Sequence, residues 1–278
     1  MAPRFQGTIL TAHARRLRRA AADRTTLPMQ LAILHDSGGV LAVAKPAGLP
    51  TQAPPGITSV ESLVRERLFA AAVTADQSAG RRRHAGGFLG IPHRLDRCVS
   101  GVLLLATTPR AARQLSRQFE RRLVRKTYLA IVTPGAIEPP RVGALLEWTD
   151  TLRKVTEQPR AEVVPSGTAE GREAVTTGRV RAVATDGSLL LELEPLTGRM
   201  HQLRVQAAAR GLPVVGDVLY GGRLVEHAPP TDTRAAAIGL HAWRITFLDP
   251  VTAASTTVTC PPPTGNPWQA HVADLASA

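Results

Sequence analysis

The apolar run at residues 101–106, Gly-Val-Leu-Leu-Leu-Ala, constrains the fold of this chain more than any other segment. Its length suits a buried strand, because a strand with one face in solvent would alternate apolar and polar residues. Thr108-Pro109 follows, and this pair is typical of the N-cap and first turn of a helix. Beyond it, Ala112, Leu115 and Phe119 share one helical face while arginines occupy the other. The sequence therefore predicts a buried strand followed by an amphipathic helix.

Further strands and helices alternate irregularly along the chain. Apolar or alternating segments predict strands, and clusters of Gly, Asp and Pro mark the turns between them. The segments so predicted are a hairpin over 31–44, strands at 126–132, 161–164, 189–193 and 240–247, a helical pattern from Arg199 to Gly211, and a short C-terminal helix. Most of 134–175 is polar and rich in turns. This pattern favours an α+β domain around a large mixed sheet.

Two basic segments fall outside the predicted sheet. Residues 1–28 form a basic, alanine-rich N-terminal arm that includes Arg15-Arg16-Leu17-Arg18-Arg19, and we expect this arm to be helical or disordered. Residues 29–278 form the globular domain. Within it, the Gly-rich and Arg-rich stretch 77–87 is predicted to be a mobile surface loop.

The net charge indicates a polyanionic partner. The chain carries 34 Lys and Arg against 22 Asp and Glu, which gives a net charge of +12 and a pI near 11.2. Only Lys45, Lys126 and Lys154 are lysines. A GC-rich genome would account for most of the preference for arginine over lysine. Binding to nucleic acid would account for most of the excess of positive charge. Aromatic residues make up only 4% of the chain, which disfavours an extended stacking platform for single strands.

Several other classes are disfavoured by missing signals. Cys98 and Cys260 have neither metal-site nor redox-motif spacing, and no apolar stretch approaches the ~20 residues of a membrane span. We therefore expect a soluble, cytoplasmic protein. The sequence lacks a phosphate-binding loop ending in Gly-Lys, a His-Glu-x-x-His zinc motif and a Gly-x-Ser-x-Gly serine elbow.

The segment His93-Arg94-Leu95-Asp96-Arg97 is the strongest candidate for chemistry. By itself, Asp96 is more readily interpreted as a turn or ion-pair residue than as a catalytic one. Its surroundings change that interpretation. Residues 93–106 closely resemble the signature of RluA-type pseudouridine synthases, and other blocks of that family occur in the same order. These blocks are Val43–Leu49, Lys126–Val132, Leu196–Val205, Gly216–Gly221 and Leu240–Ala242. The resemblance spans roughly residues 31–270.

This resemblance implies the pseudouridine synthase fold, with a central active-site cleft flanked by helices and loops. We expect no S4-type RNA-binding domain before residue 31, because about thirty residues are too few for one. The implied reaction detaches uracil from ribose at its glycosidic nitrogen and rejoins it through carbon 5, without metal or cofactor. Asp96 would be the catalytic carboxylate, as nucleophile or as base. Arg204 would pair with Asp96, and Tyr128 would stack on the uracil near the proton of carbon 5. Phosphate binding is the alternative for Arg204, and a half-buried strand position is the alternative for Tyr128.

The implied partner is structured rRNA or tRNA, bound by a monomer that flips the target uridine out of its stack. The residues expected to contact this RNA are Arg94, His93, Lys45, Arg97, Arg199 and His201. For Lys45, a structural role in the Lys-Pro-x-Gly turn is equally compatible with the sequence. For Arg94, the alternative is an ion pair within the protein.

Two positions depart from the family pattern. Val99 stands where threonine is usual, and Met200 where threonine or serine is usual, so the placement of Asp96 or the choice of RNA is open to change. A rival hypothesis is an RNA-binding or chaperone protein that keeps the fold without catalysis. The presence of Asp96, Tyr128 and Arg204 argues against it. A glycosidase-like enzyme would require a second catalytic carboxylate or a group that activates water, and the sequence reveals neither.

Overall fold

A computed structural model describes residues 31–77, 87–224 and 236–276. All of them belong to one compact unit, residues 31–278. The predicted N-terminal arm and nearly all of the predicted loop at 77–87 lie outside the described residues.

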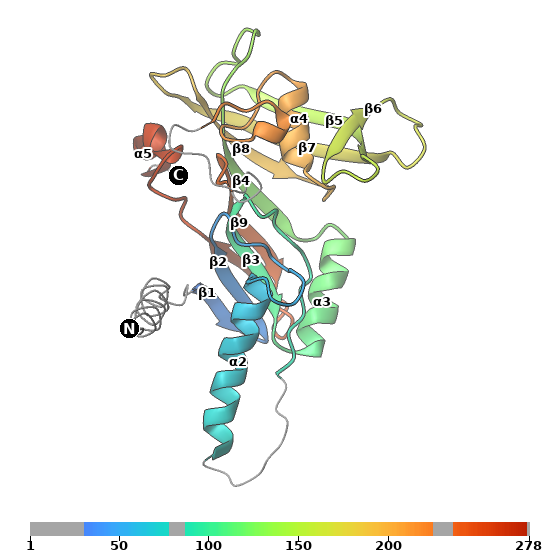
Figure 1. The fold of residues 1–278 in the computed structure, drawn as a ribbon, viewed down its shortest axis with the longest axis vertical. Helices are drawn as coiled ribbons and strands as arrows, with labels where there is room; N and C mark the ends of the chain where they lie inside the picture. The colour runs from blue at the N-terminus through green and yellow to red at the C-terminus, as the bar shows by residue number, and fades with distance from the viewer. Residues whose placement is uncertain (1–30, 78–86, 225–235, 277–278) are drawn as a thin grey trace, which may run out of the picture. The chain divides into compact units, whose positions relative to one another are not determined.

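A mixed sheet of ten strands forms the centre of the described structure (Figure 1). Its order is β1-β2-β3-β9-β4-β8-β7-β5-β6, and β10 pairs with β9. The strands are β1 (Ala32–Ser37), β2 (Val40–Lys45), β3 (Ser100–Ala106), β4 (Arg125–Val132), β5 (Leu145–Lys154), β6 (Ala161–Val164), β7 (Arg172–Val183), β8 (Leu189–Pro195), β9 (Leu240–Leu248) and β10 (Ser255–Thr259). The predicted α+β fold with a mixed sheet is confirmed.

The two halves of the sheet join where β3 lies parallel to β9 over a short register, Ser100 opposite His241 and Gly101 opposite Ala242. Gly101 has φ +123°, and a Cβ atom there would lie 2.2 Å from the carbonyl oxygen of Ala242. Only glycine permits this conformation and this approach. The join places the loop that precedes β3, with Asp96, beside β4 and β9.

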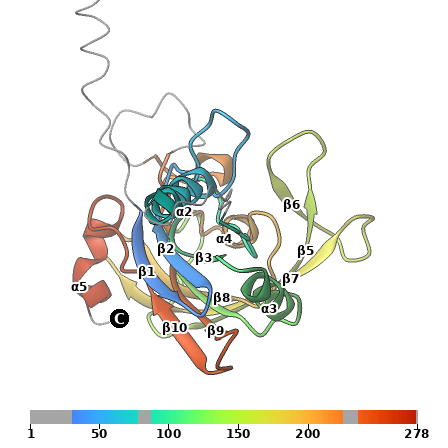
Figure 2. The same cartoon turned by 90° about the horizontal axis from the view of Figure 1, so that it is seen from below.

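Three helices cover one side of the sheet, as Figure 2 shows. They are α2 (Val60–Gln77), α3 (Pro109–Glu120) and α4 (Gln202–Ala209). Short helices η1 (Val218–Tyr220), η3 (Trp268–His271) and α5 (Val272–Ala276) complete the described structure. None of the described helices has both the length and the apolar character needed to cross a lipid bilayer.

The predicted strand and helix around residue 105 are confirmed. All residues of β3 are buried, and Leu103, Leu104 and Leu105 have no exposed surface. The hydroxyl of Thr108 accepts a hydrogen bond from the backbone N–H of Ala111 and caps α3, with proline in the first turn. Helix α3 packs Ala111 and Leu115 into the core between β3 and β9.

The sequence interpretation missed several elements, among them the short strand β10. Strands β5 and β7 occupy most of the segment that looked like turns, because both alternate between buried and exposed residues and carry many polar side chains. Helix α2 was not predicted either. Its apolar positions do not form a clear stripe, so helical periodicity gives no signal there. Strand β6 was predicted at its observed position.

Candidate active site

The loop that carries Asp96 is held from behind by the turn that follows β2. The amine of Lys45 donates hydrogen bonds to the carbonyl oxygens of Pro46 (2.9 Å), Leu49 (2.7 Å) and Arg97 (3.2 Å). The backbone N–H of Gly48 also donates to the Arg97 carbonyl, at 2.8 Å. Lys45 is only 1% exposed, and burial lowers its pKa to about 8. The Lys-Pro-Ala-Gly turn is thus a scaffold for the Asp96 loop.

Thr51 fixes the residue before Asp96. Its buried hydroxyl accepts from the backbone N–H of Leu95 (3.2 Å) and donates to the carbonyl oxygen of Leu95 (3.0 Å). The N–H of Val99 donates to the carbonyl oxygen of Asp96 at 3.1 Å, which closes the turn on the other side. These bonds constrain the backbone on both sides of Asp96, so the orientation of its carboxylate is set largely by the protein.

An ion-pair chain links Asp96 to the buried interior. Nη1 of Arg204 lies 3.1 Å from Oδ2 of Asp96, while Nε and Nη2 of Arg204 bind the two carboxylate oxygens of Asp217 at 2.6 and 2.8 Å. Asp217 is 2% exposed and the Arg204 side chain 7%, whereas the Asp96 side chain is 33% exposed. The predicted pairing of Arg204 with Asp96 is confirmed. Asp217 was not predicted.

Burial alone would lower the pKa of Arg204, but the hydrogen bonds to Asp217 and the charges of Asp217 and Asp96 raise it above its ordinary value. The guanidinium therefore stays charged at any working pH. The Asp96 carboxylate faces the cleft, and the charge of Arg204 lies behind it on the protein side.

His201 approaches the same oxygen of the Asp96 carboxylate as Arg204 does. Its Nε2 is 3.7 Å from Oδ2 of Asp96, and its Nδ1 is 2.9 Å from the hydroxyl of Tyr220. Burial is the main cause that lowers the pKa of His201, so the ring is neutral near pH 7. Tyr220 is anchored in turn by both backbone groups of Ala161 in β6. His201 thus connects the Asp96 site to the β5–β6 hairpin.

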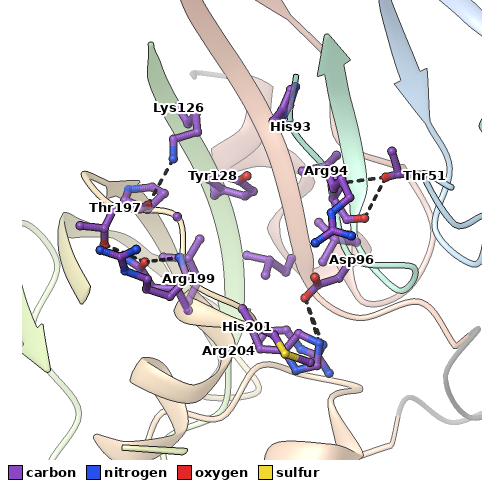
Figure 3. Close-up of a pocket in the computed structure, with 18 of the residues that line it drawn as sticks. Thr51, His93, Arg94, Asp96, Lys126, Tyr128, Thr197, Arg199, His201 and Arg204 are labelled. Atoms are coloured by element: carbon purple, nitrogen blue, oxygen red, sulfur yellow. Dashed lines mark hydrogen bonds and ion pairs between the residues drawn. The ribbon is translucent and has the colours of Figure 1, made fainter. Parts of the chain in front are cut away.

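Tyr128 projects from β4 into the same cleft (Figure 3). Burial and then the charge of Asp96 raise the pKa of its phenol above the ordinary value, so the side chain is a neutral phenol at physiological pH. Lys126, two residues earlier on the same face of β4, also lines the cleft and donates to the carbonyl oxygen of Thr197 at 3.3 Å. Burial lowers the pKa of Lys126 to about 8.

The remaining predicted RNA contacts differ in their positions. Arg94 is exposed and lines the cleft, and Arg97 and Arg199 also line it. Nε of Arg97 donates to the carbonyl of Gly48 (2.8 Å), and Nε of Arg199 donates to the carbonyl of Glu173 (2.9 Å). Arg199 keeps further N–H groups on its guanidinium. These three arginines are therefore placed where a polyanion in the cleft would meet them.

Two residues predicted to contact RNA, Lys45 and His93, are bonded to other groups of the protein. The prediction for Lys45 is wrong, because its buried amine is already bound to three carbonyl groups and cannot reach RNA in this conformation. The ring of His93 lines the cleft but stacks on Phe119 at 4.7 Å, and its Nε2 accepts from the N–H of Leu104 at 2.9 Å. Burial lowers the pKa of His93 to about 3, so the ring is uncharged.

The cleft itself is large and rich in basic groups. Its volume is about 1400 Å³, and it is lined by the Asp96 loop, the end of α3, β4, the β5–β6 turn and the start of α4. Its acidic lining residues are Asp96, Glu120 and Glu157. Val99 is buried in its wall, whereas Met200 is 37% exposed at its edge. The described residues contain no group of three or more His, Cys, Asp and Glu side chains that would suit a metal ion.

Sequence reasoning also missed the network that places the start of α4. The amide oxygen of Gln202 accepts from the hydroxyl of Thr197 (2.7 Å) and from the N–H of Arg199 (3.0 Å), and its amide nitrogen donates to the hydroxyl of Thr176 (2.9 Å). The block of residues 196–205 therefore has a structural meaning: it fixes Arg204 beside Asp96. No local pattern shows this, because Thr176 comes from a distant strand.

Fold and site together define a class of protein: an enzyme that presents one guanidinium-paired carboxylate in a basic cleft large enough for a nucleotide within a polymer. Comparisons with known proteins agree with this class. Residues 39–209 match the family model for RNA pseudouridylate synthase. The chain belongs to that family, whose members isomerise uridine in RNA, and the family and enzyme class predicted from the sequence are confirmed.

Individual relatives extend the match over most of the chain. This chain is 34% identical over 243 residues to the ribosomal large subunit pseudouridine synthase D of Xanthomonas campestris pv. campestris. The match covers 84% of this chain and 66% of that protein. It is 31% identical to the dual-specificity RNA pseudouridine synthase RluA of Yersinia pestis, covering 78% and 92%. The solved structure of human RNA pseudouridylate synthase domain containing 1 matches with a TM-score of 0.62 at 25% identity, covering 85% of each chain.

Proposed function

We propose that this chain converts specific uridines in structured rRNA or tRNA to pseudouridine, with Asp96 as the catalytic carboxylate. The observation that carries the proposal is the Asp96 carboxylate in an open basic cleft, paired with an Arg204 that Asp217 holds from behind. A protein that only bound RNA would gain nothing from an anionic group facing phosphates. The names of the relatives support both RNA classes, because they include ribosomal, dual-specificity and tRNA enzymes.

The proposed reaction is an isomerisation, so every atom of the uridine is retained except for exchanged protons. The bond between ribose carbon 1 and uracil nitrogen 1 breaks, the base turns, and a bond from carbon 1 to uracil carbon 5 forms. Nitrogen 1 gains a proton, and carbon 5 loses one to solvent. Asp96 starts this sequence, and Arg204 orients its carboxylate.

Tyr128 has a different role in the proposal. As a neutral phenol on β4, it offers a flat ring in the cleft against which a flipped uracil stacks. Because its pKa is raised, it is not an anionic base at physiological pH. Removal of the carbon 5 proton by Tyr128 therefore requires a proton acceptor for the phenol. Arg94, Arg97, Arg199 and His201 would contact the sugar and phosphates around the flipped nucleotide.

Release of tritium from RNA labelled at uracil carbon 5 tests this proposal. Purified wild-type protein should release label from ribosomal or transfer RNA of the source organism, and Asp96→Asn should release none. Asp150→Asn is the matched control, because Asp150 is an ion-paired aspartate that does not line the cleft. Release by Asp96→Asn at the wild-type rate would refute the role of Asp96. Tight RNA binding without release by the wild type would favour a binding protein instead.

We also propose that the enzyme acts as a monomer in the cytoplasm. The two described cysteines, Cys98 and Cys260, are free and buried, which is compatible with a reducing compartment. Sedimentation of the purified chain with and without RNA tests the monomer, and fractionation of cells tests the compartment. A stable dimer at working concentration would overturn the first part.

A further inference from the structure

Arg122 occupies a backbone position that normally selects glycine. Helix α3 ends in a Schellman motif, in which the N–H of Arg122 donates to the carbonyl of Phe119 (3.1 Å) and the N–H of Leu123 donates to the carbonyl of Gln118 (2.9 Å). Arg122 is the left-handed residue of this motif, with φ +57°. Glycine is usual there, because a side chain makes the left-handed conformation unfavourable. An arginine at this point therefore costs stability.

No hydrogen bond or ion pair of the Arg122 side chain within the described residues offsets this cost. Arg122 is exposed, and its guanidinium forms no hydrogen bond or ion pair with any residue in the described part of the chain. It does line the cleft that contains Asp96. Strand β4 begins three residues later, at Arg125, and carries Tyr128. A strained, unpartnered cation at the edge of a catalytic cleft points to a ligand that supplies its partner.

Arg122 continues a row of arginines along α3. Arg110, Arg113, Arg117 and Arg121 are spaced by three, four and four residues, so they share one face of the helix, and all four are exposed. This face is separate from the core face formed by Ala111, Leu115 and Gln118. At 1.5 Å per residue the row is roughly 16 Å long. We call these four residues and Arg122 the α3 arginine row.

The helix dipole does not account for this row. Cations near a helix C-terminus are stabilising, which explains Arg117 and Arg121, but Arg110 lies in the first turn, where a cation is unfavourable. The row also has no ion-pair partners among the described residues. Its positive charge is therefore directed outward over the full length of the helix.

We propose that the α3 arginine row binds the phosphate backbone of the double-stranded stem next to the target uridine, with Arg122 as the contact at the cleft. This inference rests on the proposed function, because it assumes that RNA occupies the cleft. A stem is favoured over a single strand because the row has no aromatic residue on which bases could stack. The one aromatic residue of α3, Phe119, is stacked on His93. Double-stranded RNA is recognised largely through its backbone.

The sharpest test is Arg122→Gly, made in the inactive Asp96→Asn protein so that binding is measured without turnover. The probe is a fluorescein-labelled RNA hairpin with a uridine-containing loop. We expect Kd near 0.15 M salt to rise roughly fivefold, and the salt slope to fall by about 0.9, for one lost phosphate contact. The melting temperature should equal or exceed that of the parent, because glycine suits the left-handed position.

Ala253→Gly is the matched control for the backbone change. Ala253 is exposed in the β9–β10 turn with φ +59°, and it does not line the cleft. This variant should gain the same backbone freedom and keep the parental Kd. If Arg122→Gly keeps the parental Kd and salt slope, Arg122 does not contact the stem and the proposal is overturned.

Charge reversal tests the rest of the row. Arg117→Glu should weaken hairpin binding more than Arg141→Glu, which makes the same charge change at an exposed position in the β4–β5 connection. Equal losses would refute a specific row. An equal loss for an unstructured oligouridine would refute the assignment to a stem. Absence of tritium release by the wild type would refute the proposed function, whereas these Kd comparisons in the Asp96→Asn protein decide the arginine row independently.

Discussion

Asp217→Asn perturbs the site at a residue that never meets the substrate. Asp217 is 2% exposed and binds Arg204 through two short contacts, 2.6 and 2.8 Å, while Arg204 reaches Asp96 at 3.1 Å. Asparagine keeps the shape and one acceptor oxygen, but it loses the charge and turns an NH2 group toward the guanidinium. A buried Arg204 then has only the partly exposed Asp96 as an ionic partner.

The size of the effect follows from this geometry. Breaking a buried ion pair costs about 3–5 kcal/mol, and the remaining acceptor places Asp217→Asn near the lower end, at about 3 kcal/mol. For a domain of this size, that loss lowers the melting temperature by roughly 6–12 °C. Because Arg204 loses the charge of Asp217 and one of its three fixed contacts, Asp96 is less well oriented. We expect kcat to fall on the order of 100-fold.

Thermal melting and tritium release separate the two effects. Both should be measured against Asp150→Asn, which removes a charge from the pair with Arg210 (2.9 Å) away from Asp96. At a temperature well below both melting points, Asp217→Asn should be slow and Asp150→Asn should be close to wild type. If Asp217→Asn melts with the wild type and keeps its kcat, the ion-pair chain does not hold Asp96 in its active orientation.

Three other perturbations have definite expected outcomes. Lys45→Met should lower the melting temperature, because carbonyl groups left without a donor cost about 2 kcal/mol of stability. The salt dependence of RNA binding should stay unchanged. A smaller salt slope would show that Lys45 does contact RNA. Gly101→Ala should prevent soluble expression, since its Cβ would lie 2.2 Å from the carbonyl of Ala242, and a wild-type melting curve would contradict the close β3–β9 approach. Burial lowers the pKa of His241 to about 4, so below pH 6.5 the unfolded chain binds a proton that the native state refuses. The free energy of unfolding should therefore fall by up to about 3 kcal/mol between pH 6.5 and 4, as measured by urea titration. An equally steep fall in the His241→Gln variant would show that another group causes the pH dependence.

The helices and strands that the sequence predicts best are those that bury one face or all of their side chains. The run of leucines in β3 and the capped α3 were predicted within a residue or two, because apolar periodicity and capping report directly on burial. Strands β5 and β7 were missed because their polar, half-exposed surfaces resemble loops in sequence. Their existence depends on pairing with β8 and with each other, which no local pattern records.

The site shows the same division. Asp96, Tyr128 and Arg204 were predicted through family resemblance, and the structure places them around one cleft. Asp217 was not predicted, although it lies in a block that had been recognised, because sequence does not reveal which acidic residue faces which arginine in the interior. Lys45 was misassigned for a related reason. A lysine in a turn is usually solvated, and only the fold shows that this one is enclosed by three carbonyl groups.

Mapping pseudouridines in rRNA and tRNA from cells with and without this gene tests directly whether the enzyme forms pseudouridine and whether Asp96 is required. We expect at least one pseudouridine to disappear when the gene is deleted, to return with the wild-type gene, and not to return with Asp96→Asn expressed at the same level. An unchanged pseudouridine map after deletion, or full restoration by Asp96→Asn, would contradict it.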